Sequence, residues 1–532
     1  MKLKKILVLA AVSVLISAGT LSARGAGGTA AAPAAGETTF TLLVDADRGY
    51  TDGFYGLYDA IAKEIGVKVQ LMNFPYQAAV EQKNILLATG NYPDAIGGWI
   101  LGDNDIMTLS ADGTIIPLEG YIANTTNVKE ALAQPGVRQS MTLPDGHIYS
   151  PPYIVGEPLV SFNPWINKAW LDQLGLKMPA TTEEFRQVLI AFRDKIPPVN
   201  GQKIIPFSGT PNNLHLGTLA GWFGVNASGA ANNAGYFAVI NGRVESTIIR
   251  PEYREFIKYF AGLYKEGLVD AELFTQNEET WKAKGKQGLY GSSIAYGAGD
   301  FLAEVDPKVK ESDPSKNWQG WAPLPVLKAP GVAKPVFRNN NNGITLFRTQ
   351  FAITDKATAK AQKILDWLDR VYDPIHSTEC DTGPLGRTWK MLDLVNGIQY
   401  FQGIDTSSWT QDERDRNGWG GYSVASLPKY RRPSWKEQPR PGWENEYKEL
   451  DVRDALYKPF LEATPMPALW LTEANAKRAA DLQTAITDYV KQKQAEWVSG
   501  QADIDREWDA YIAQLNRLGL QELLQLKRAA VK

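Results

Sequence analysis

The sequence predicts an α/β fold in two or more lobes, with mainly parallel sheets flanked by helices. Strand-like and helix-like segments alternate from residue 40 onward. The chain has 532 residues, 44% of them hydrophobic, which is too long for one core and too apolar for disorder. Two long amphipathic segments near the C-terminus add a helical extension.

The first units alternate strand, helix, strand and helix, and a short third strand follows. The expected segments are Phe40–Asp45, Phe54–Ile65, Val67–Leu71, Val80–Ala88 and Pro93–Ile96. This order favours a parallel sheet covered by helices. The last strand ends in a Gly97-Gly98-Trp99 loop. Loops at the carboxyl ends of parallel strands are where such sheets bind ligands, so we expect part of a binding site there.

Later segments carry clear signals for helix starts and stops. Thr181-Thr182-Glu183-Glu184 is a capping box before an apolar stripe, and Pro251 opens a second helix that runs to Gly267. Near the C-terminus, Gly500 and Gly519 are expected to end two long helices.

The N-terminal segment is typical of an exported protein. Three lysines precede a short apolar run that ends in small residues at Ala23, which predicts a signal peptide over residues 1–23. Residues 24–36 are Gly, Ala, Thr and Pro, as in a flexible tether, so the folded part is expected from about Glu37. No cysteine lies near Ala23 to carry a lipid anchor. We therefore expect a freely diffusing periplasmic protein.

Composition argues against several classes of function. The formal charge of −3 and pI near 5.9 offer no basic field for nucleic acid. Three histidines without ligand spacing predict no zinc or other metal site, and we expect no cofactor and no catalytic residues. The only cysteine, Cys380, is expected to be a small buried residue. Asp94, Asp300 and Asp381 keep a carbohydrate-active hydrolase or lyase open as an alternative.

Two polar segments allow two interpretations each. Residues 407–443 carry six large rings among Gly, Pro, Arg and Asp, and these rings either pack beneath the loop or line a ligand site. These are Trp409, Trp419, Tyr422, Tyr430, Trp435 and Trp443. The run Arg338–Asn342 is either a hydrogen-bonding loop or a solvated connector.

Several blocks, in order, resemble the family 1 extracellular solute-binding proteins of ABC importers, in particular their long, alginate-oligosaccharide-binding-like branch. The similar blocks are Asn84–Asp94, Ile116–Leu118, Pro144–Pro152, Trp170–Phe192, Tyr264–Asp270 and Trp497–Leu520. The resemblance implies a two-lobed periplasmic-binding-protein fold of type II, a saccharide ligand held in the inter-lobe cleft, and permease subunits as partners of a monomer. Lobe 1 would hold residues 37–155 and about 325–390, and lobe 2 residues 156–324 and about 391–532, C-terminal helices included.

Two departures limit what the resemblance implies. Asn163-Pro164 stands where the family often has Arg and Asp, so a ligand or lobe contact of the family is replaced here. Alginate-type members carry a calcium loop after the helix that begins at Thr181, but the stretch Ile196–Lys203 lacks its carboxylates. We expect no calcium there, and a uronate ligand is not implied.

The candidate ligand-binding residues are six aromatic, acidic or basic side chains in the matching blocks, most of them next to glycines that would let a ligand approach the backbone. They are Trp99, Trp222, Tyr296, Asp300, Arg387 and Trp389. Asp45 and Arg48 are weaker candidates. Each tryptophan has a core role as its alternative, although Trp222 shows no helical or strand period that demands one. The expected function is saccharide capture for import, with a hydrolase, a lyase or a surface carbohydrate adhesin as the alternatives.

Overall fold

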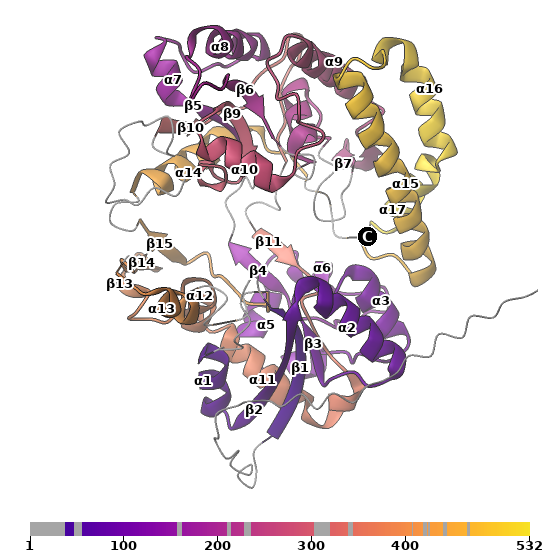
Figure 1. Ribbon diagram of the computed structural model, residues 1–532. Helices are drawn as coiled ribbons and strands as arrows, with labels where there is room; N and C mark the ends of the chain where they lie inside the picture. Colours follow the sequence, from indigo (N-terminus) through magenta and orange to yellow (C-terminus); the bar gives the residue numbers. More distant parts are fainter. Residues whose placement is uncertain are drawn as a thin grey trace, which may run out of the picture. The chain divides into compact units, whose positions relative to one another are not determined.

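The computed structural model describes residues 38–46, 56–156, 162–209, 214–227, 236–302, 320–338, 344–406, 408–418, 423, 426–439, 444–464, 466 and 469–531. Within this part of the chain, buried side chains gather on both faces of two separate four-stranded sheets. Each sheet with the helices on its faces forms one lobe (Figure 1). The α/β, two-lobed fold class is therefore confirmed.

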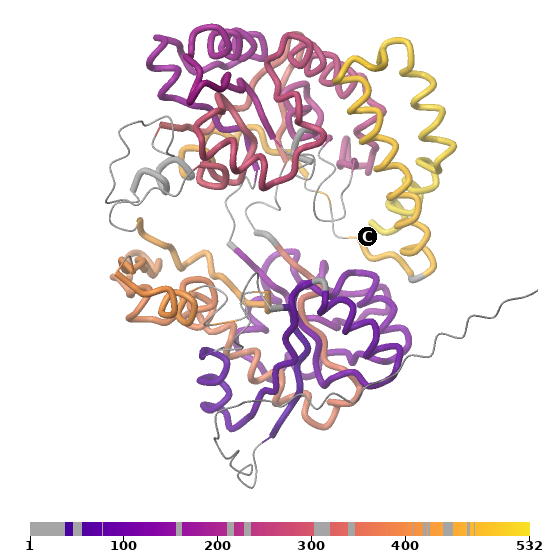
Figure 2. Tube along the Cα trace, in the orientation of Figure 1, coloured from indigo at the N-terminus to yellow at the C-terminus, as the bar shows by residue number. Residues whose placement is uncertain are grey.

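The first sheet has the strand order β12-β3-β1-β2. Its strands are β1 (Thr38–Ala46), β2 (Val67–Pro75), β3 (Ala95–Gly97) and β12 (Phe351–Ile353). β1 pairs in parallel with β2 and β3, whereas β12 pairs antiparallel with β3. Figure 2 shows the same arrangement by colour, with the late strand β12 beside the indigo N-terminal strands.

Alternate residues of β1 enter opposite cores of this first lobe. Phe40, Leu42 and Val44 pack with helices α1 (Gly56–Glu64) and α11 (Ala361–Val371). Leu43 packs on the other face, in the core that contains α2 (Tyr76–Thr89) and α3 (Asp103–Ala111). The period of two along a strand explains this division. Short helices complete the lobe; they are α4 (Glu119–Ile122), α5 (Asn127–Leu132), α6 (Val137–Met141) and α12 (Pro374–Thr382).

The second sheet has the order β10-β5-β9-β6. Its strands are β5 (Asn163–Asn167), β6 (Ile205–Ser208), β9 (Tyr290–Ala295) and β10 (Trp321–Pro323). Only β6 and β9 pair in parallel; β5 is antiparallel to both of its neighbours. The expectation of a mainly parallel sheet is therefore wrong for this lobe. The direction of β5 is set by its pairing with β9 and β10, which lie more than 100 residues away in sequence.

Helices cover both faces of the second sheet. Trp165 and Ile166 are neighbours in β5 that enter different cores, as the strand period requires. The helices are α7 (Lys168–Gln173), α8 (Thr182–Lys195), α9 (Pro251–Lys265), α10 (Glu278–Lys286) and α14 (Glu444–Tyr457), with the 3₁₀ helix η1 (Leu214–Phe223) and the hairpin β7 (Phe237–Ile240) with β8 (Arg243–Ser246). The capping box at Thr181 is confirmed, because its Oγ1 accepts from the Glu184 amide and the Glu184 carboxylate accepts from the Thr181 amide.

The helical C-terminal extension is confirmed. It consists of α15 (Glu473–Val498), α16 (Ile504–Arg517) and α17 (Leu520–Ala529). Ile486 of α15 and Leu515 of α16 lie in the same core as Phe256 of α9. The chain continues beyond Gly519 as a further helix, because this glycine adopts a φ of 93° and begins α17. Within the described residues, no helix is both long and apolar enough to cross a membrane.

The chain passes between the lobes at several points. β4 (Tyr153–Gly156) precedes the passage into the second lobe, and β11 (Ile344–Phe347) follows the return, so that the two strands pair antiparallel. Leu327 and Phe337 pack in a core of the second lobe, and Leu427 and Tyr430 in a core of the first. A separate three-stranded sheet is formed by β13 (Trp389–Val395), β14 (Ile398–Gly403) and β15 (Trp435–Gln438), and α13 (Gln411–Asn417) lies between β14 and β15 in sequence.

Candidate functional site

An exposed tryptophan with two aromatic neighbours lies at the carboxyl end of the first sheet. Trp99 follows β3 and is 38% exposed. Its ring meets Phe347 edge-on, with the centroids 4.8 Å apart, and lies 6.0 Å from the ring of Tyr153. Tyr153 and Phe347 face each other across the β4–β11 pair. We call these three residues the Trp99 face. Trp99 itself lies where the parallel strands β1 and β3 end, which is the edge at which such sheets bind ligands.

A buried carboxylate holds the Trp99 loop in place. Asp45, near the end of β1, accepts a hydrogen bond of 2.9 Å from the Trp99 amide. Gly98 adopts a φ of 88°, and a Cβ at this position would lie 1.7 Å from Asp45 Oδ1. Burial raises the pKa of Asp45, an effect that the amide hydrogen bonds partly offset. The glycine therefore serves the close approach of Asp45, and not the approach of a ligand to this backbone.

A buried cluster of charged side chains contacts the ring of Tyr153. Lys429 is fully buried, and its Nζ lies 2.6 Å from Asp381 Oδ1 and 5.2 Å from the centre of the Tyr153 ring. Arg431 Nε donates to the other oxygen of Asp381 at 2.6 Å. Burial is the largest single effect and disfavours the charge of Lys429, but the attraction of Asp381 together with smaller contributions from Tyr153 and Cys380 outweighs it, so the pKa of Lys429 is raised. Likewise, the two cations lower the pKa of Asp381 despite its burial.

Tyr296 and Asp300 lie together after β9 in the second lobe. The carboxylate of Asp300 accepts from the Tyr296 amide at 2.9 Å and closes a turn that ends in the 3₁₀ helix Ala298–Asp300. Arg453 of α14 donates to the Tyr296 carbonyl at 2.8 Å, and its guanidinium lies 5.4 Å from the ring centre. A Cβ added at Gly297 would meet nothing within 4 Å, so this turn has open space beside it.

Arg387 and Trp389 have different surroundings although they are almost adjacent. Arg387 is exposed, with its guanidinium 5.5 Å from the centre of the Trp409 ring. Trp389 is fully buried at the start of β13, where its indole donates to the Gly383 carbonyl at 2.9 Å. Its ring packs against Phe401, with the centroids 5.5 Å apart. Trp389 therefore belongs to the packed aromatic cluster that it forms with Phe401 and Trp435 on the small three-stranded sheet.

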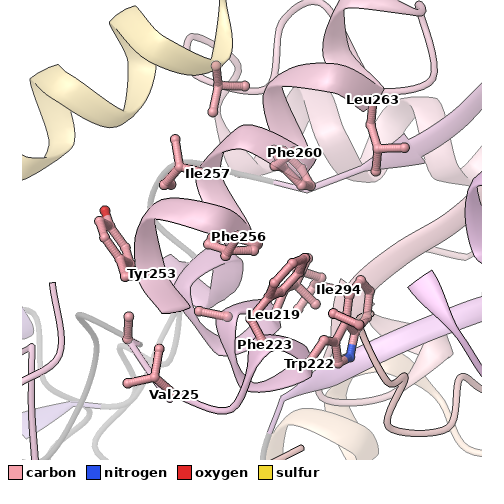
Figure 3. Packing of buried hydrophobic residues seen from close by; sticks show 14 of the residues in the cluster. Leu219, Trp222, Phe223, Val225, Tyr253, Phe256, Ile257, Phe260, Leu263 and Ile294 are labelled. Carbon is pink, nitrogen blue, oxygen red and sulfur yellow. The ribbon is translucent and has the colours of Figure 1, made fainter. Parts of the chain in front are cut away.

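Trp222 lies inside the larger core of the second lobe, 1% exposed (Figure 3). Its ring meets Phe185 edge-on at 5.6 Å. The segment is a 3₁₀ helix, so Trp222 lies in regular structure and faces the core although no helical or strand period was evident around it in the sequence. A Cβ at Gly221 would lie 2.0 Å from the Val336 carbonyl, which shows that this glycine allows two chain segments to pack. The burial of Trp222 fits the core alternative.

The loop segments are described only in part. Within residues 407–443, Tyr430 is buried in a core of the first lobe, and Trp435 packs against Trp389. Arg48, Asn339–Asn342, Trp419, Tyr422 and Trp443 lie outside the described residues.

The stretch Ile196–Lys203, where no calcium is expected, contains a tight hairpin turn. Val199 and Gln202 exchange two backbone hydrogen bonds of 2.9 Å, with Asn200 and Gly201 between them at φ of 49° and 78°. An Asn-Gly pair is the usual choice for such a turn, because both residues tolerate positive φ. Among the residues that the structure describes, no group of three or more acidic, histidine or cysteine side chains could hold a metal ion.

Four residues around these sites were not predicted from the sequence: Tyr153, Phe347, Lys429 and Arg453. Tyr153 directly follows Pro151-Pro152, in one of the blocks that resemble the family. The two buried cations gave no local signal, because Lys and Arg are rarely buried and their partners lie far away in the sequence. Cys380 is buried as expected, and burial raises the pKa of its thiol to about 12.

Comparisons with known proteins agree with this geometry. No family model matches the chain. The chain is 30% identical over 482 residues to the fructooligosaccharide ABC transporter substrate-binding protein FusA of Streptococcus pneumoniae, covering 88% of this chain and 85% of that protein.

Solved structures give the same result. FusA in complex with kestose is 25% identical, with a TM-score of 0.74, and the match covers 92% of this chain and 98% of that one. The alginate-binding protein AlgQ2 without calcium ion is 22% identical, with a TM-score of 0.67 and coverage of 93% and 97%, and so shares the fold. With its two lobes and its extended similarity to FusA, the chain belongs to the family 1 solute-binding proteins, the substrate-binding components of ABC transporters.

Proposed function

We propose that this substrate-binding protein captures an oligosaccharide and delivers it to the permease subunits of an ABC importer. The observation that carries the proposal is the Trp99 face, an exposed indole held by Asp45 beside Tyr153 and Phe347. Sugar rings offer C–H faces to aromatic rings and hydroxyls to polar groups, so a saccharide site needs both kinds of partner. The named ligand of FusA, kestose, makes that trisaccharide the first ligand to test.

The proposed ligand contacts come from both lobes. Trp99 and Phe347 would supply stacking surface in the first lobe, with the buried Tyr153 supporting their rings, and Tyr296 with Asp300 would supply a ring and a carboxylate in the second. Arg387 stays in the proposal as an exposed cation. We assign Trp222 and Trp389 to packing, because almost none of either side chain is exposed. A ligand held by residues of both lobes would be enclosed by hinge closure, since the chain leaves the first lobe after β4 and returns to it at β11, which pairs with β4.

We propose binding without chemistry. The three carboxylates that kept a hydrolase open each have a partner within the fold. Asp94 accepts from Lys360 at 2.7 Å and from the Thr41 amide, Asp381 is paired with Lys429, and Asp300 closes the Tyr296 turn. A glycosidase needs a carboxylic acid and a second carboxylate placed on both sides of one bond, which such engaged groups serve poorly. A surface adhesin is the second alternative, and it would need no hinge closure.

The location follows from the same proposal. We propose export with cleavage near Ala23, release into the periplasm without a lipid anchor, and action as a monomer. Mass spectrometry of the exported protein tests the first part: a mature chain without acyl groups is expected, and a full-length or acylated chain would contradict it.

A thermal-shift screen with product analysis tests the function. The panel holds kestose, nystose, raffinose, maltotriose, lacto-N-tetraose and tri-galacturonate. A saccharide at 100 times its dissociation constant stabilises the folded protein by about 2.7 kcal/mol. We expect such a shift with at least one saccharide, recovered unchanged by chromatography. No shift across the panel, or appearance of cleaved sugar, would overturn the proposal.

A further inference from the structure

Two buried polar groups at one end of the second sheet have atoms without a hydrogen-bond partner among the described residues. They are Oδ1 of Asn163 and Nη2 of Arg453. Both residues are fully buried. Buried polar groups in folded proteins nearly always have partners, so each exception calls for an explanation.

The two groups lie at the same end of β9. Asn163 is the first residue of β5 and pairs with Ala295, the last residue of β9. Arg453 donates through Nη1 to the carbonyl of the next residue, Tyr296, and through Nε to Asp454 at 3.1 Å. One unpaired acceptor and one unpaired donor therefore lie around consecutive residues of the chain. Phe162 borders the same place, its ring 6.1 Å from that of Tyr296.

The orientation of the Asn163 amide is fixed by its contacts to Pro164 and to the hydroxyl of Tyr457, which accepts from the amide and donates to the Leu324 carbonyl. Nδ2 donates to the Pro164 carbonyl at 2.8 Å, which only the nitrogen can do. The unpaired atom is thus the oxygen, an acceptor. Arg453 can only donate, because a guanidinium carries five N–H groups and no acceptor.

The chemistry of a matching ligand group follows from this pair. A carboxylate or phosphate could accept from Arg453 but could not donate to Asn163 Oδ1, and an ammonium group could donate but not accept. A hydroxyl does both, since it carries one donor and two lone pairs. We propose that Asn163 and Arg453 form a hydroxyl-binding subsite for the saccharide, beside the ring of Tyr296. This inference rests on the proposed function and assigns a residue of α14 to the ligand site.

The energetics support a ligand role over a packing role. An unpaired buried acceptor and a buried cation with a free N–H both weaken the unliganded fold, because each has lost its water without regaining a partner. A ligand hydroxyl that pairs with both would recover this loss on binding. Substitution of Asn163, which carries the unpaired acceptor, should therefore lower the stability of the liganded protein more than that of the unliganded protein.

The test uses Asn163→Leu and Arg453→Lys, with Tyr511→Phe as the matched control. Tyr511 has a buried hydroxyl without a partner in a core of the same lobe, and the control removes only that group. Isothermal titration with kestose and the other panel saccharides gives the dissociation constant, and calorimetry gives the unliganded melting temperature. We expect Asn163→Leu to weaken binding about tenfold, with a near-native melting temperature, because removal of the unpaired Oδ1 offsets the loss of the Nδ2 bond to Pro164.

Arg453→Lys keeps the charge and loses the forked donor, so we expect at least a tenfold weaker affinity. The control should bind as the wild type does. If a variant fails to fold, titration of the wild type with monodeoxy analogues of kestose still tests the subsite from the side of the ligand. Removal of one particular hydroxyl should weaken binding about tenfold, and this loss should vanish in Asn163→Leu.

Three results would overturn the subsite. Wild-type affinity in both variants would do so, as would a large loss of melting temperature with affinity retained, which indicates a structural role. Equal binding of every deoxy analogue would do so as well. If the wild type binds no saccharide of the panel, the proposed function itself fails and the subsite falls with it, which distinguishes the two failures.

Discussion

The amide of Trp99 donates a 2.9 Å hydrogen bond to the buried carboxylate of Asp45, which ties the loop after β3 to the end of β1. Gly98 permits this contact. We expect Gly98→Ala to lose about 2–4 kcal/mol of unfolding free energy, from left-handed backbone strain and from the clash with Asp45. The matched control is Gly113→Ala, where φ is 78° and an added Cβ meets nothing within 4 Å. It should lose about 1 kcal/mol. Equal losses in urea denaturation would contradict the account.

The buried Asp381–Lys429 pair should make the free energy of unfolding depend on pH in the acidic range. The pKa of Asp381 is lowered by the cations, so its contribution is present above the unfolded pKa of about 4 and is lost as the pH falls through the lower folded value. Asp381→Asn should cost about 3 kcal/mol at neutral pH, because it leaves Lys429 buried without its counter-ion. The difference from wild type should shrink below pH 4.

The surface pair of Asp505 with Arg254 serves as its control. The pKa of Asp505 is also lowered, mainly by hydrogen bonds from Arg254 and Lys258 that outweigh its desolvation, but the side chain is 48% exposed. Asp505→Asn should therefore cost less than about 1 kcal/mol. Two results would contradict the stabilising role of the buried pair. One is a similar loss of unfolding free energy in both variants, and the other is a difference between wild type and Asp381→Asn that does not change with pH.

Calcium removal should leave the protein unchanged. The turn from Val199 to Gln202 offers Asn200 and backbone carbonyls, whereas Ca²⁺ takes six to eight oxygens that include carboxylates. We expect the same melting temperature with and without a chelator. A drop that added calcium reverses would mean that other residues supply the ligands.

Much of the fold could be predicted because its signals are local. The capping box at Thr181 and the strand–helix alternation of the first lobe depend on residues close in sequence, and both are found in the structure. The pairing of β12 with β3 could not be predicted, since it joins segments more than 250 residues apart. The same holds for the antiparallel entry of β5 into the second sheet.

The site was harder to predict, and the tryptophans show why. Trp99 and Trp222 both follow glycines, yet one ring is exposed and the other lies in a core. Gly98 makes room for Asp45 and Gly221 for Val336, and neither partner is near in sequence. Lys429 and Arg453 were missed because a buried cation is recognised only by its tertiary partners. A glycine beside an aromatic residue therefore does not by itself mark a ligand site.

Trp222 should be a stability residue. Trp222→Ala removes a large ring that packs against Phe185 in the core, and such a truncation costs about 3–5 kcal/mol. We expect a clearly lower melting temperature, with saccharide affinity retained at low temperature. A near-native melting temperature together with weak binding would instead place the ring at the ligand.

Trp99→Ala tests the central claim most directly. If the exposed indole stacks on a sugar, loss of about 80 Å² of apolar contact at about 25 cal/mol per Å² costs about 2 kcal/mol, which is about thirtyfold in affinity. The measurement is isothermal titration of wild type and variant with the panel saccharide that binds the wild type, together with the melting temperature of each unliganded protein. The account predicts about thirtyfold weaker binding with near-native melting; unchanged affinity in the folded variant would contradict it.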